Sequence, residues 1–98
     1  MDKYIYLNEL YDCYKELFTS KQREYFEEYY FDNLSLSEIA DNYQVTRNAV
    51  HNELKHMENR LQELEDKLKM NEKKNKIIEI LDNKIDNSIM ERIKNILE

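Results

Sequence analysis

The 98-residue sequence contains no glycine and no proline. Tight β-hairpin turns depend on residues with positive φ, a role that glycine fills at the lowest steric cost. A chain that lacks glycine and proline, and in which 37% of the residues are charged, suits helices far better than strands. The sequence therefore predicts an all-α fold.

Length and cysteine content exclude several classes of protein. A chain of 98 residues supports one small domain, or one domain with a helical extension. Cys13 is the sole cysteine, so neither an intramolecular disulfide nor a cysteine-based zinc cluster can form within one chain. The sequence shows no basic-then-apolar leader and no run of about eighteen apolar residues. We therefore expect a protein of the reducing cytoplasm that does not insert into a membrane.

Four helices are predicted in the first two thirds of the chain. They cover residues 3–18, 19–32, 36–43 and a long segment that begins near residue 46. Thr19 with Gln22, and Ser35 with Glu38, have the spacing of capping boxes, which open the second and third helices. Thr46 is a third capping residue, and its hydroxyl can accept a hydrogen bond from an amide of the long helix.

The long fourth helix carries a heptad stripe of apolar residues. The stripe consists of Val50, Leu54, Met57, Leu61, Leu64 and Leu68. Alternating steps of four and three residues favour a partner helix. For Met57, Leu61, Leu64 and Leu68 that partner is either the first helix or the tail of the same chain, or a second chain. The length of the stripe favours a homodimer, because a small domain leaves such a stripe exposed.

The last third of the chain is predicted to be a helical tail. The polar run 71–76 is interpreted as a break or a solvated turn. A short helix follows it, and another begins near Asn87 and Ser88. The predicted division is therefore a domain at residues 1–70 and a C-terminal helical tail at residues 71–98.

Residues 34–50, with the sequence LSLSEIADNYQVTRNAV, have the pattern of a helix-turn-helix. Ile39 and Ala40 fall on the inner face of the short third helix, and the small Ala40 side chain lets the fourth helix cross closely. The residues expected to close the small core are Val45, Ala49, Val50 and Leu54. The turn position at Gln44 usually carries glycine, because it needs a positive φ that costs other residues about 1 kcal/mol.

The outer face of the fourth helix is the candidate binding surface. Its predicted residues are Thr46, Arg47, Asn48, His51, Asn52 and Lys55. Amide and guanidinium groups suit base edges and phosphates, and the N-terminus of a helix favours an anion. The competing interpretation is an ordinary solvated helix face. A net charge of −6 also argues against a simple nucleic-acid binder, because phosphate neutralisation normally supplies most of the affinity.

The sequence shows no pattern for catalysis, for a cofactor or for a metal site. His51 and His56 are five positions apart, so they do not share a helix face as a metal-binding i, i+4 pair does. The aromatic residues from 25 to 31 are numerous enough to stack on single-stranded nucleic acid, but their helical spacing favours core packing. Cys13 has no predicted catalytic partner and is expected to be a buried structural thiol. We therefore expect a binding protein and not an enzyme.

Three segments carry a resemblance to a known family: KQREYFEEYY at 21–30, LSLSEIA at 34–40 and VTRNAV at 45–50. Together they closely resemble the bacterial YlxM-like proteins. Residues 17–62 are more distantly similar to region four of bacterial sigma factors. The resemblance implies a sigma-region-four-like helix-turn-helix whose recognition helix runs from 46 to 55, with Arg47 and Asn48 in its leading turn.

The family resemblance also implies a function, which is an accessory or regulatory role in the signal recognition particle pathway. We therefore expect a helix-turn-helix regulator that binds DNA or the signal recognition particle RNA. The alternative is a non-catalytic interaction module of the targeting machinery that contacts signal recognition particle proteins and keeps the helix-turn-helix as a scaffold.

Overall fold

The computed structural model describes residues 2–82 and 86–98, and this part of the chain is built from helices without any strand. The elements are α1 (Lys3–Tyr14), the 3₁₀ helix η1 (Lys15–Leu17), α2 (Ser20–Tyr30), α3 (Leu36–Tyr43), α4 (Arg47–Leu68), α5 (Met70–Asp82) and α6 (Asn87–Leu97). The prediction of an all-α fold is confirmed.

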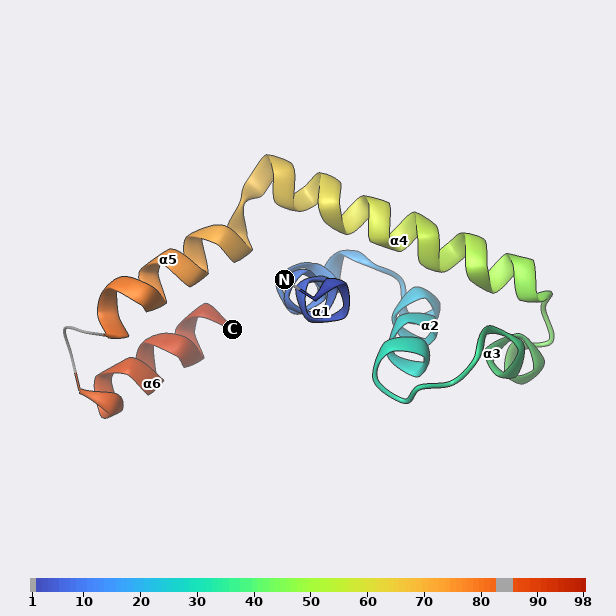
Figure 1. Cartoon of the computed structure of the whole chain (residues 1–98), viewed down its shortest axis with the longest axis horizontal. Coiled ribbons are helices and arrows are strands. Elements are labelled where there is room, and N and C mark those ends of the chain that lie inside the picture. Colours follow the sequence, from blue (N-terminus) through green and yellow to red (C-terminus); the bar gives the residue numbers. More distant parts are fainter. Residues whose placement is uncertain (1, 83–85) are drawn as a thin grey trace.

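The long helix α4 spans much of the molecule and contacts most of the other helices (Figure 1). α1 and α2 lie along one side of α4, and α3 packs near its N-terminal end. α5 and α6 form an antiparallel hairpin beyond its C-terminal end. The molecule is elongated, with principal dimensions of 51 × 26 × 24 Å, and the candidate binding face and the hairpin lie towards opposite ends.

Side-chain caps fix where the helices begin, as their spacing predicted. Thr19 and Gln22 form a capping box at the start of α2, and Ser35 and Glu38 form another at the start of α3. The Thr46 hydroxyl accepts a hydrogen bond of 3.0 Å from an amide in the first turn of α4. Each cap satisfies amides that the first turn of a helix leaves without an intrahelical partner.

The first helix ends earlier than the predicted range of 3–18. α1 stops at Tyr14, and the chain tightens into η1 before Phe18 adopts an extended conformation with φ −105° and ψ 155°. The Phe18 amide donates to the Lys15 carbonyl at 3.1 Å. This tighter turn buries Phe18 and leaves Leu17 exposed, although both residues fall in the helix predicted at 3–18.

The core lies where α1, α2 and α3 pack against α4. Its buried residues are Leu7, Leu10, Tyr11, Tyr14, Phe18, Tyr25, Phe26, Ile39, Ala40, Val50, Leu54, Met57, Leu61 and Leu64. Met57, Leu61 and Leu64 are therefore buried against helices of the same chain, which is one of the two arrangements that the sequence allowed, and the homodimer stays a prediction. Leu68, the last residue of the heptad stripe, is 47% exposed.

A single residue separates α4 from α5, in place of the predicted break at 71–76. Lys69 adopts the left-handed conformation with φ 53° and ψ 32°, and its amide donates to the Glu65 carbonyl at 2.8 Å. α5 begins at the next residue and includes the whole polar run. The predicted break is wrong, and the division of the chain into 1–70 and 71–98 stays a prediction.

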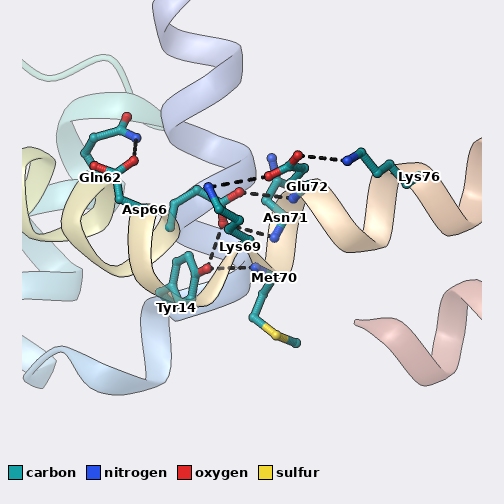
Figure 2. Close-up of polar contacts among 9 residues, drawn as sticks. Tyr14, Gln62, Asp66, Lys69, Met70, Asn71, Glu72 and Lys76 are labelled. Atoms are coloured by element: carbon teal, nitrogen blue, oxygen red, sulfur yellow. Dashed lines mark hydrogen bonds and ion pairs between the residues drawn. The ribbon is translucent and has the colours of Figure 1, made fainter.

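A buried carboxylate, that of Glu65, explains why this polar run is helical. Figure 2 shows Tyr14, Met70, Asn71 and Glu72 gathered at this junction. Glu65 accepts hydrogen bonds from the Asn71 amide at 3.1 Å and from the Glu72 amide at 3.0 Å. It also accepts from the Tyr14 hydroxyl at 2.7 Å, and the Tyr14 oxygen accepts from the Met70 amide at 3.1 Å. Three amides at the start of α5 are thus satisfied, and the negative charge lies where the helix dipole favours it.

The α5–α6 hairpin leaves several apolar side chains in solvent. Met90 is buried, but the exposed residues include Met70, Ile77, Ile80, Ile89 and Ile96. α6 begins after Asp86, whose carboxylate accepts from an amide of its first turn at 3.0 Å. This start agrees with the helix predicted to begin near Asn87.

Candidate nucleic-acid interface

α3, the following turn and the first half of α4 form the helix-turn-helix that residues 34–50 predicted. Ile39 and Ala40 are buried in the same cluster as Val50 and Leu54, as their pattern predicted. Ala49 differs from its prediction, because it is exposed at the edge of a shallow pocket. The packing of α3 on α4 therefore relies on the other apolar positions.

The turn between these helices has the positive φ expected at Gln44. Its backbone has φ 56° and ψ 44°, which is the left-handed region. The Gln44 amide donates to the Asp41 carbonyl at 3.4 Å, and the Val45 amide donates to the Ala40 carbonyl at 3.0 Å. These two bonds form a Schellman motif, which ends α3 and sets the direction in which α4 starts.

All six predicted binding residues are exposed on the first half of α4. They are Thr46, Arg47, Asn48, His51, Asn52 and Lys55, and together they are called the α4 face here. Thr46 already uses its hydroxyl to cap the helix. In the described part of the chain, the side chains of the other five form no hydrogen bond or ion pair. At 3.6 residues per turn these five lie within an arc of about 140°, so one ligand can reach all of them.

Two acidic side chains of α4 flank this face, and both contact other helices. Glu53 accepts a hydrogen bond of 2.7 Å from the Gln22 amide group on α2. Glu58 accepts from the Tyr30 hydroxyl at 2.9 Å and lies 3.4 Å from the Lys3 ammonium group. The formally charged groups of the α4 face itself are therefore basic.

A pocket of about 210 Å³ opens beside the α4 face, where the first turn of α1 and the end of α2 approach α4. Its polar and aromatic lining residues are Lys3, Tyr4, Tyr29, Tyr30, His51, Lys55 and Glu58. His51 and Lys55 belong to both the pocket and the α4 face. Sequence reasoning missed Lys3 and Tyr4, because nothing in their local pattern places the first turn of α1 beside α4.

Tyr29 links this pocket to the leading turn of α4. A hydrogen bond to Tyr4 and burial raise the pKa of Tyr29, and the nearby positive charge of Arg47 acts in the opposite direction. Tyr29 and Tyr30 are half-buried and Phe31 is exposed, whereas Tyr25 and Phe26 are fully in the core. The core-packing interpretation of the aromatic run is therefore confirmed for two of its five residues.

Within the described residues, the remaining reactive side chains are not gathered into a further site. Cys13 is half-buried, burial raises the pKa of its thiol, and its sulfur lies 3.9 Å from the Asn71 side-chain oxygen. Among residues 2–82 and 86–98, no three His, Cys, Asp or Glu side chains are arranged to hold a metal ion. Within the same residues, no helix is long and apolar enough to cross a bilayer.

Comparison with known proteins identifies relatives over most of the chain. A UPF0122 protein of Shouchella clausii is 48% identical over 73 residues, which are 74% of this chain and 67% of that protein. UPF0122 proteins of Halalkalibacterium halodurans and Geobacillus sp. are 44% and 46% identical over 63 residues, or 64% of this chain. Those two matches span 58% and 57% of the relatives' own lengths.

The family model described as "Putative helix-turn-helix protein, YlxM / p13 like" matches residues 1–97. Its description names a helix-turn-helix and no enzymatic activity. The match extends through α5 and α6, so the C-terminal hairpin is part of the family pattern along with the helix-turn-helix. The chain therefore belongs to the UPF0122 family of YlxM-like helix-turn-helix proteins, as the resemblance in residues 21–50 predicted.

Proposed function

We propose that this protein binds nucleic acid through the α4 face and acts without catalysis. The observation that carries the proposal is the set of five exposed polar side chains that have no partner among the described residues. These side chains are Arg47, Asn48, His51, Asn52 and Lys55. Arginine, lysine and asparagine are the residue types that most often contact phosphates and base edges.

The packing of α4 supports this proposal. Val50 and Leu54 hold the buried side of the helix in the core, so the α4 face is directed away from the protein. The first turn of α4 contains no acidic residue, which keeps its positive dipole end open to an anion. The ligands we propose are duplex DNA and, as the family resemblance implies, the RNA of the signal recognition particle, both in the cytoplasm.

The direct test is binding of a labelled DNA duplex and of a signal recognition particle RNA hairpin, measured by fluorescence anisotropy at several salt concentrations. We expect Arg47→Ala and Lys55→Ala each to weaken binding by about 1–3 kcal/mol if they contact bases. If they contact phosphates, each variant should reduce the slope of the logarithm of the binding constant against the logarithm of salt concentration by about one. Because basic side chains that neutralise phosphates release counterions, binding should be strongest at low salt.

Matched controls are available on the hairpin, at the other end of the molecule. Arg92 and Lys73 are exposed and lie on α6 and α5, so Arg92→Ala and Lys73→Ala remove the same charges away from the α4 face. We expect these two variants to bind as the wild type does. Equal losses in the control and α4 variants, or no binding of either probe by the wild type at low salt, would refute the proposal.

We also propose that two copies of the chain associate through the α5–α6 hairpin. The uncovered end of the heptad stripe, Leu68, continues into exposed Met70 and Ile77. Residues 69–98 carry seven basic and six acidic side chains, whereas residues 1–34 carry four and eight. Two hairpins can therefore meet without strong charge repulsion.

Light scattering tests this self-association. We expect a mass above the 12.1 kDa of one chain, and a return to one chain in the double variant Ile80→Lys, Ile96→Lys. Both isoleucines are exposed, so the variant should keep its helices. A monomeric wild type at concentrations of about 100 µM, a range where weak specific contacts are populated, would rule the association out.

A further inference from the structure

The pocket beside the α4 face is lined by aromatic rings whose flat faces are not stacked on one another. The rings of Tyr4 and Tyr30 meet edge to face, with centroids 5.2 Å apart and planes at 64°. Tyr29 meets Tyr30 at 5.0 Å and 86°. By contrast, Tyr11 and Phe26 in the core are stacked at 4.1 Å and 13°. Tyr30 also packs on Phe26 at 4.4 Å and 33°, so the ring surface left for another planar group is that of Tyr29 and of Tyr4, which is 53% exposed.

The charges of the pocket differ between its edge and its interior. Lys3 has an exposed side chain whose ammonium group lies 3.4 Å from the Glu58 carboxylate, and Lys55 is exposed on the α4 face. Glu58 is inside, with a side chain that is 16% exposed. Its carboxylate would repel a phosphate that entered the pocket, but it can accept a hydrogen bond from an N–H group. The pocket therefore favours a ligand with an anionic part at the edge and a planar part with N–H donors inside.

The volume of the pocket fits one such planar group. Pockets for drug-sized ligands have volumes of about 300–1,000 Å³, and this pocket, at about 210 Å³, is smaller than that range. Leu36 and Leu54 add apolar surface to the lining. The pocket on the other side of α4 lacks these features, because its aromatic residue Tyr25 is buried and Lys21 already lies 5.6 Å above that ring.

We propose that this pocket receives one unpaired nucleotide of the nucleic acid that lies on the α4 face. The base packs against Tyr4 and Tyr29 and donates a hydrogen bond to Glu58, and its phosphate lies between Lys3 and Lys55. His51 and Lys55 belong to both surfaces, so a strand on the α4 face passes the mouth of the pocket. The inference rests on the proposed function and adds to it a preference for nucleic acid with an unpaired base.

The test compares three versions of one labelled hairpin: fully paired, with a single-nucleotide bulge, and with an abasic residue at the bulge. Each is made as RNA and as DNA, which separates the two sources of an unpaired nucleotide. We expect the wild type to bind the bulged hairpin at least about five-fold more tightly than the paired one, since stacking on one aromatic residue commonly contributes that much. The abasic hairpin should bind as weakly as the paired one.

Variants of Tyr4 test whether the pocket causes the tighter binding of the bulged hairpin. Tyr4 is 53% exposed, so Tyr4→Ala should remain folded, and circular dichroism checks this. We expect Tyr4→Ala to remove the preference for the bulge while the paired hairpin binds as before, and Tyr4→Phe to keep the preference. We expect Lys3→Ala to weaken binding of the bulged hairpin, and Lys15→Ala, which removes an exposed lysine of η1, to leave it unchanged.

The outcomes separate this inference from the proposed function. If Arg47→Ala weakens binding of all hairpins but the wild type shows no preference for the bulge, the pocket inference fails and the proposed function stands. The pocket inference also fails if Tyr4→Ala keeps the full preference. If the wild type binds none of the hairpins, the proposed function fails and the pocket inference fails with it.

Discussion

Tyrosine hydroxyls join the helices of this protein by donating to glutamates. The pairs are Tyr11 with Glu27 at 2.5 Å, Tyr14 with Glu65 at 2.7 Å, Tyr30 with Glu58 at 2.9 Å, and Tyr43 with Glu28. Each pair connects two different helices. Part of the acidic excess is therefore structural, and the net charge of −6 is a poor guide to the charge of the α4 face.

Ionisation of Tyr14 makes the free energy of unfolding depend on pH in the alkaline range. Burial, together with the hydrogen bond to Glu65, raises the pKa of Tyr14 to about 12, while the unfolded value is about 10. Between these values the folded chain keeps the proton and the unfolded chain loses it. This contribution to stability is thus complete below about pH 10 and is lost as the pH rises towards 12.

Urea unfolding between pH 9 and pH 12 measures this effect. We expect the free energy of unfolding of the wild type to fall over this range, and to fall less steeply in Tyr14→Phe, which cannot ionise. Other tyrosines with raised pKa values contribute to the decline in both proteins. Identical slopes in the two proteins would show that Tyr14 does not contribute.

Glu65 is a buried charge whose partners are specific. It accepts from the Tyr14 hydroxyl and from two backbone amides of α5. We expect Glu65→Ala to lower the free energy of unfolding by about 2–3 kcal/mol, because it leaves buried donors without acceptors. Hydrogen exchange should also become faster at the start of α5.

Glu63→Ala is the matched control for this prediction. Glu63 is exposed on the same helix and forms an ion pair of 3.4 Å with Arg60. Exposed pairs of this kind contribute little, so we expect a change below about 0.5 kcal/mol. A loss at Glu65 no larger than the loss at Glu63 would contradict the assigned role of the buried carboxylate.

At the scale of elements, α3 and α4 both end at non-glycine residues in the left-handed conformation. Gln44 and Lys69 have φ values of 56° and 53°. Left-handed residues are the usual helix ends, but a side chain with a Cβ makes them more costly than glycine. The chain has no glycine, so this conformational cost arises at the C-terminal ends of both α3 and α4.

Replacing Gln44 with glycine should therefore stabilise the protein. We expect Gln44→Gly to raise the free energy of unfolding by about 0.5–1 kcal/mol, because relief of the left-handed strain exceeds the extra entropy of the unfolded chain. Asp41→Gly, within α3, should instead destabilise by about 1 kcal/mol. Urea denaturation measures both, and a destabilised Gln44→Gly would show that the side chain itself supports the turn.

Local signals in the sequence predicted most helix starts. Thr19, Ser35 and Thr46 cap α2, α3 and α4, since a cap depends on residues within one turn. The helix that contains the polar run 71–76 was missed because its cap does not come from residues within its first turn. Its helix is capped by Glu65 and Tyr14, and Tyr14 is distant in the sequence and close only in the folded structure.

At the scale of the whole molecule, the heptad stripe of α4 is buried from Val50 to Leu64 in the core that α4 forms with α1, α2 and α3. We expect Leu61→Ala, at a fully buried position, to destabilise by about 2–5 kcal/mol. Leu68→Ala, at a half-exposed position of the same stripe, should cost less than about 1 kcal/mol. The cost of Leu61→Ala should not depend on protein concentration, whereas a cost that grows on dilution would indicate an intermolecular contact.

The candidate site was predictable from the sequence only in part. The α4 face follows from one helix and its period, which is why all six of its residues are exposed as expected. The adjoining pocket brings Lys3 and Tyr4 beside Lys55, and this proximity depends on how α1 crosses α4. The same crossing brings α1 onto the heptad stripe. Periodicity alone did not show whether the stripe packs against its own chain or against a second chain.

α4 has two roles, because one side of it belongs to the core and the other side is the proposed binding face. This helix has 22 residues and is about 33 Å long, and its buried side is fixed in the core from Val50 to Leu64. It cannot swivel or slide to improve its fit without disrupting that core. In the proposed complex, bending, opening or reshaping would therefore fall on the nucleic acid, whose deformability would then help to select which sequences bind.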